Sequence, residues 1–172
     1  MHMTMTDLHE FFYYRLFPRH RYHIVKTGLK PGWHDTDERI LHANFQLLVD
    51  YIESELAWLE YSMNYEKYGN IGWFRRWRFK RNKEMGLTHL NWEINLPDDF
   101  DGRQAASAKE KLALYKWWTE ERPKDWENQG SLIDIPNGLY ATKSYFEKEK
   151  SLYQKDEDML IRLMKIRTSL WT

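Results

Sequence analysis

Apolar side chains recur at helical spacing along residues 35–61, and this stripe constrains the fold more than any other feature of the sequence. Its members are Leu41, Phe45, Leu48, Ile52, Leu56 and Leu59. Spacings of three and four residues place them all on one face of an α-helix. A second set widens that face: Ile40, Leu47, Tyr51 and Trp58. We therefore expect a central helix that contacts neighbours on more than one side.

Two further segments carry the same signature. Asp101 and Gln104 have the form of a helix start, and Pro123 predicts where that helix ends. Its expected face is Ala105, Ala108, Leu112, Tyr115 and Trp118. Ser144 and Glu147 form a capping box. The apolar positions after it, Leu152, Met159, Leu163, Ile166 and Leu170, predict a terminal helix to about residue 171, roughly 40 Å long if unbroken.

The other segments are less regular. Residues 7–16 indicate a short helix, and residues 22–27 and 132–135 have the composition of short extended pieces. Residues 70–83 fit both a strand and a helix, and the polar residues 124–138 predict a loop. The expected fold class is mainly α: a helical domain with a central amphipathic helix, a long C-terminal helix and room for a few short strands.

Length and composition exclude several classes of protein. A chain of 172 residues without cysteine predicts one domain, residues 1–172, with no disulfide scaffold, thiol catalysis or cysteine zinc site. Its 26 basic residues balance its 26 acidic ones, which argues against a general nucleic-acid coat. No run approaches the roughly 20 apolar residues of a membrane span, and the start lacks signal-peptide features. We expect a soluble, cytoplasmic protein with no membrane partner.

Aromatic side chains are unusually frequent, with nine Trp, eleven Tyr and eight Phe. This exceeds what one core of this size needs, and surface aromatics gather at oligomer interfaces and in ligand pockets. The long terminal helix also outreaches a globule of this length, whose radius of gyration would be about 15 to 16 Å. Both features favour a homo-oligomer.

Residues 73–83 hold six cations and four aromatic rings in eleven positions. Guanidinium groups pair with phosphate and aromatic faces stack on bases, so this interleaving suits a nucleotide or, less favoured, a nucleic-acid strand. The candidate ligand-binding residues are Trp73, Arg75, Arg76, Trp77, Arg78 and Arg81. Residues 35–60 carry a net charge of minus six, however, and charge pairing between the two segments is the favoured explanation. The sequence leaves both interpretations open.

Catalysis and metal binding have little support. His34, Asp37, Glu38 and His42 are metal-capable and lie within nine positions, yet Asp35 beside them fits a helix cap and no further ligands are recognisable. The chain has no Gly-x-Ser-x-Gly elbow and no glycine-rich phosphate loop. We expect no metal, no cofactor and no enzymatic activity.

Two stretches, residues 32–53 (GWHDTDERILHANFQLLVDYIE) and 156–172 (DEDMLIRLMKIRTSLWT), resemble segments of small uncharacterised proteins of tailed bacteriophages. The resemblance implies a viral context and a location in the host cytoplasm. The resulting hypothesis is a non-enzymatic phage binding protein that sequesters a small anionic, nucleotide-like ligand or inhibits a host protein. The alternatives are a structural component of the virion and a metal-dependent hydrolase.

Overall fold

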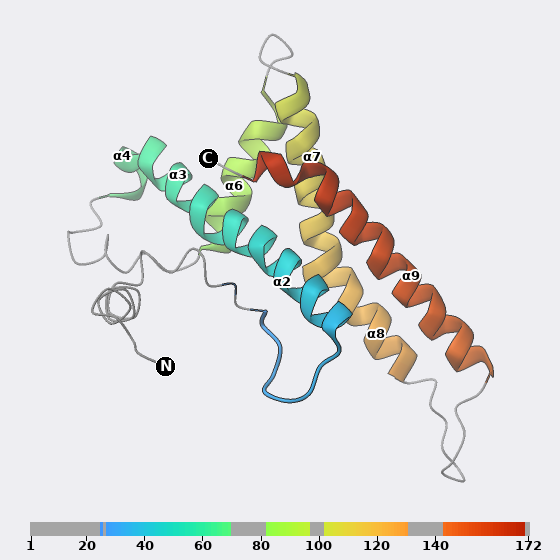
Figure 1. Ribbon diagram of the computed structural model, residues 1–172. Helices are drawn as coiled ribbons and strands as arrows, with labels where there is room; N and C mark the ends of the chain where they lie inside the picture. Colours follow the sequence, from blue (N-terminus) through green and yellow to red (C-terminus); the bar gives the residue numbers. More distant parts are fainter. Residues whose placement is uncertain (1–24, 26, 70–81, 97–101, 131–142, 171–172) are drawn as a thin grey trace, which may run out of the picture.

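The computed structural model describes residues 25, 27–69, 82–96, 102–130 and 143–170, and all regular structure within these ranges is helical (Figure 1). The mainly α fold class is therefore confirmed. The short helix expected at residues 7–16 and the extended piece at 132–135 lie outside the described residues. Of the extended piece expected at 22–27, only Val25 and Thr27 are described, and neither is in a strand.

The expected central helix is present. It consists of α2 (Thr36–Asp50), a π-helical turn η2 (Tyr51–Leu56) and α3 (Ala57–Met63), followed by the single turn α4 (Tyr65–Tyr68). The N-cap is Asp35, as the sequence predicts, but its side chain makes no capping hydrogen bond. Five of the six predicted stripe positions, Leu41, Phe45, Leu48, Ile52 and Leu56, are buried.

The helix α6 (Lys83–Ile94) packs against η2 and α3. A π-helical turn disturbs the regular i to i+4 bonding and leaves carbonyls available to outside donors. Here the backbone N–H of Asn82 donates to the carbonyl oxygen of Glu53 at 2.8 Å, and the Asn82 side chain accepts from the N–H of Met85. Gly86 allows the close approach, because an added Cβ would overlap the carbonyl oxygen of Ile52.

A second long helix consists of α7 (Gly102–Lys116), the π-helical turn η3 (Trp117–Glu121) and α8 (Arg122–Gly130). The prediction that this helix stops before Pro123 is wrong. The loop expected at residues 124–138 is helical over residues 124–130, and its remainder lies outside the described residues. The backbone N–H of Arg122 bonds back to the carbonyl of Trp117 across the π-helical turn. Pro123 thus follows a change of hydrogen-bond register, at the start of a new α segment, where proline is tolerated.

The expected terminal helix is α9 (Lys143–Ile166), extended by one 3₁₀ turn, η4 (Arg167–Ser169). It contacts α2, α7 and α8 and runs antiparallel beside the combined α7–α8 helix (Figure 1). Arg122 fixes this packing with two hydrogen bonds to Asp156, at 2.9 and 2.8 Å. Because α7 and α8 of the same chain accompany α9, its length no longer argues for a second subunit.

The core lies where the central helix meets α6, α7, η3 and α9. Phe45 stacks on Trp118, with ring centroids 4.6 Å apart and an interplanar angle of 12°. The ring of Trp117 also contacts Phe45, at a centroid distance of 5.1 Å and a tilt of 58°. Some of the numerous aromatic side chains are therefore packed in the core of this chain. None of the described helices combines the length and apolar character that a membrane crossing requires.

Candidate functional site

The basic and aromatic segment predicted as a ligand site falls almost entirely outside the described residues. This holds for every candidate in it: Trp73, Arg75, Arg76, Trp77, Arg78 and Arg81. Of its six cations, only Lys83 is described; it lies 3.7 Å from Glu120 and over the ring of Tyr115. That partner is in η3, not in the acidic helix at residues 35–60, so neither interpretation of the segment is decided.

The candidate metal ligands His34, Asp37, Glu38 and His42 do not form a metal-binding group in the part of the chain that the structure describes. His34 Nδ1 pairs with Glu38 Oε2 at 2.9 Å, and its Nε2 bonds to the carbonyl oxygen of Lys30. His42 bonds instead to the carbonyl of Thr27 and sets its ring edge against Trp118. Across the described ranges, no three His, Cys, Asp or Glu side chains are grouped so that they could hold a metal ion.

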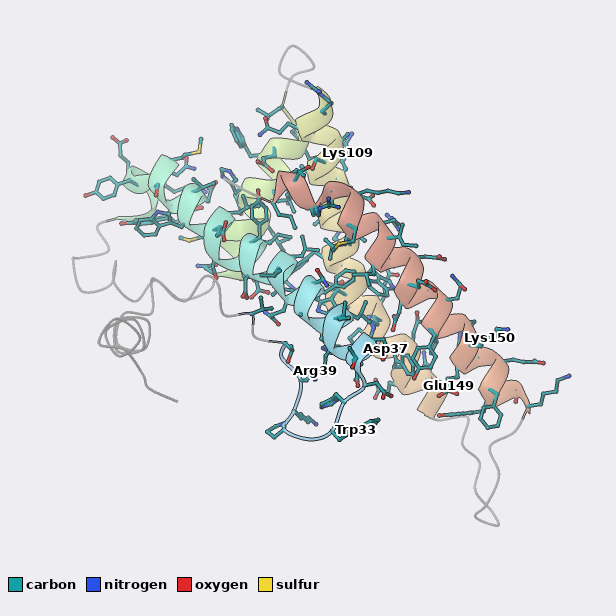
Figure 2. The ribbon with its side chains drawn as sticks, in the orientation of Figure 1. Trp33, Asp37, Arg39, Lys109, Glu149 and Lys150 are labelled. Carbon is teal, nitrogen blue, oxygen red and sulfur yellow. The ribbon has the colours of Figure 1, made fainter. Side chains whose placement is uncertain are left out.

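A cavity of about 460 Å³ borders the loop before α2. Trp33 and Arg39 are among its lining residues and extend into solvent there (Figure 2). Every residue around it is exposed or only half-buried. This cavity therefore has no fully buried ionisable side chain.

A second cavity, of about 530 Å³, opens between η2, α3, α6, α7 and η4. Its ionisable and amide side chains come from the central helix, α6 and α7: Tyr51, His89, Glu93, Arg103, Gln104 and Lys111. Several of these groups are both buried and ionisable, a combination that marks candidate binding and catalytic sites. We refer to this as the polar cavity.

Lys111 is the most unusual group in the polar cavity. Only 4% of the residue is exposed. Its ammonium group donates a hydrogen bond of 3.2 Å to the Tyr51 hydroxyl and lies 4.8 Å from the centre of that ring. Burial lowers the pKa of Lys111, while the negative charge of Glu93 acts in the opposite direction. Burial, with the charges of Glu93 and Glu55, also raises the pKa of Tyr51, so its hydroxyl keeps its proton.

Glu93 supplies the negative charge of the polar cavity and is 7% exposed. Its Oε1 accepts a hydrogen bond of 3.3 Å from the Gln104 amide. Its buried Oε2 has no hydrogen-bond partner among the described residues. A buried carboxylate oxygen without a donor is costly. An N–H or O–H group in the cavity would satisfy it.

A buried pair of ionisable groups adjoins the cavity. His89, 3% exposed, places Nδ1 at 3.5 Å from Glu60 Oε2, outside hydrogen-bonding geometry. The other Glu60 oxygen accepts from the Tyr68 hydroxyl at 3.0 Å. The His89 ring lies 5.2 Å from that of Trp92, which is 46% exposed and forms part of the cavity wall. Trp92 thus offers an aromatic surface at the cavity.

The sequence analysis does not predict this site, because it uses apolar residues alone to identify the buried face of a helix, and the cavity residues are mostly polar. On α6 the buried residues are Gly86, His89, Leu90 and Glu93. They follow the i, i+3, i+4, i+7 spacing of a helix face, although only one of them is apolar. On α7, Lys111 similarly takes a buried position three residues after Ala108. Polar residues at the helical spacing of a buried face are therefore the sequence feature that could have indicated the cavity.

No known protein family, curated protein or solved structure shows significant similarity to this chain. The polar cavity is therefore the structural feature from which a function can be inferred.

Proposed function

We propose that this chain is a non-enzymatic binding protein that holds a small anionic, nucleotide-like ligand in the polar cavity. One observation carries the proposal: the buried Oε2 of Glu93, which has no partner among the described residues, borders a cavity that also contains the buried Lys111. Opposite charges that share a cavity suit a ligand with both an N–H donor and an anionic group.

Each cavity group has a corresponding role in this proposal. Lys111 and Arg103 both line the cavity and supply the positive charge that an anionic group of the ligand would meet. Glu93 accepts an N–H from a base. The exposed face of Trp92 provides a stacking surface for a ring.

The phage context remains part of the proposal, and it rests on the resemblance of residues 32–53 and 156–172 to phage proteins. In that context, holding a nucleotide would remove a signal of the host cell. A virion component would behave differently, because it would co-sediment with purified particles whether or not a ligand is present.

Calorimetric titration of the purified chain with a panel of nucleotides tests the proposal. We expect one class to bind with one site per chain, and Glu93→Gln to weaken that binding about 10- to 100-fold, because a hydrogen bond to a charged group contributes about 1.5 to 3 kcal/mol. The control is Glu84→Gln, an exposed glutamate on the same helix, which should leave affinity unchanged.

Two results would overturn the proposal. A flat titration for every nucleotide would remove the ligand. Weakening by Arg78→Ala, with Glu93→Gln unaffected, would move the site to the basic segment that the sequence singles out.

A further inference from the structure

The amine of Lys111 combines three features that few lysines share. It is almost fully buried, it borders a cavity large enough for a small molecule, and its hydrogen bond goes to a neutral hydroxyl rather than to a carboxylate. Among the described ion pairs, none joins Lys111 to Glu93 or to any other acid. A surface lysine, by contrast, is a hydrated cation that stays protonated at neutral pH.

We propose that the ε-amine of Lys111 reacts with a small carbonyl compound inside the polar cavity and holds it as an imine. The inference uses the cavity of the proposed function but requires no nucleotide. Its ligand class is a small aldehyde or ketone that carries a negative charge.

The chemistry needs only groups that the cavity contains. The neutral amine attacks the carbonyl carbon, a C–N bond forms, and the electron pair of the C=O double bond moves to oxygen, which takes a proton. Loss of that oxygen as water then forms the C=N bond, and both protons of the amine leave with the water. The Tyr51 hydroxyl, 3.2 Å from the Lys111 nitrogen, can donate to the developing oxygen anion.

The electrostatic environment supports this reactivity. Burial lowers the pKa of Lys111, which raises the fraction of neutral, nucleophilic amine at neutral pH. Glu93 opposes that effect, but it also balances the positive charge that the neutral imine gains when it takes up a proton from water.

Reductive trapping tests the inference on the folded, full-length protein. The chain is incubated at neutral pH with glyoxylate and cyanoborohydride, which reduces any imine to a stable secondary amine, and the modified lysines are then located by peptide mass spectrometry. We expect one adduct per chain, on Lys111. It should form faster than on Lys109, an exposed lysine two positions away on α7 (Figure 2).

Two controls keep the result interpretable. In urea the advantage of Lys111 over Lys109 should disappear, because it depends on the folded cavity. The variant Lys111→Arg keeps the positive charge and should lose the adduct; if it does not fold, the comparison of the two lysines in the native chain still decides. Labelling of Lys109 as fast as Lys111, or an advantage that persists in urea, would overturn the inference.

The outcome also separates this inference from the proposed function. Nucleotide binding without preferential labelling of Lys111 refutes the imine and leaves the binding proposal intact. Preferential labelling of Lys111 with flat nucleotide titrations supports the imine and refutes the binding proposal.

Discussion

Gly86→Ala isolates the contact that brings α6 against the central helix. Gly86 is buried within α6 and does not have a positive φ, so alanine fits its backbone conformation. On helix propensity alone, the substitution would stabilise the protein by up to about 1 kcal/mol. The structure predicts the opposite sign.

The expected cost follows from the surroundings of the added methyl group. Its carbon would overlap the Ile52 carbonyl oxygen and lie 2.8 Å from the carbonyl carbon, and both atoms belong to the backbone. Overpacking of this kind costs about 1 to 3 kcal/mol. Moving α6 away would weaken the hydrogen bond between Asn82 and Glu53, which contributes about 1 kcal/mol. With the propensity gain subtracted, we expect a loss of about 1 to 3 kcal/mol.

Urea unfolding followed by circular dichroism measures this change. The matched control is Gly102→Ala at the exposed start of α7, where an added Cβ meets nothing within 4 Å. That variant should be neutral or slightly stabilised. If Gly86→Ala were as stable as the native chain, with an unchanged dependence on urea, the close packing of α6 on η2 would be refuted.

Three further predictions concern the packing of α9, the response to pH and self-association. Asp156→Asn should lower the free energy of unfolding in urea by about 3 kcal/mol, because it removes the negative charge that pairs with the largely buried guanidinium of Arg122. Lys143→Ala removes an exposed ion pair with Glu147 and should lower it by less than about 0.5 kcal/mol. Equal losses in the two variants would contradict the role given to burial. Burial, followed by the charge of Arg122, lowers the pKa of His42 from its ordinary value of 6.5, so the unfolded chain binds this proton more readily and the free energy of unfolding should fall as the pH drops below that value. His42→Gln should reduce this fall between about pH 7 and pH 5, and an unchanged pH dependence would show that other groups cause it. The aromatic excess predicts self-association, which light scattering would refute by giving the mass of a single chain at micromolar concentration.

The sequence by itself determined the helices whose buried faces are apolar. The central helix and α9 follow from residues such as Phe45, Leu48, Leu152 and Leu163, all of which are buried. In these helices burial and hydrophobicity coincide, so the spacing of apolar residues reports directly which face is covered.

Only the tertiary structure decided the position of α6, the continuation of α7 into α8, and the polar cavity. The buried face of α6 includes a glycine, which is needed for a backbone contact with Ile52, and a carboxylate whose amide partner is Gln104 on α7. Pro123 is tolerated because a π-helical turn changes the hydrogen-bond register just before it. In each case the reason lies in a backbone path or in a partner on another helix. A pattern of apolar residues along one segment contains neither.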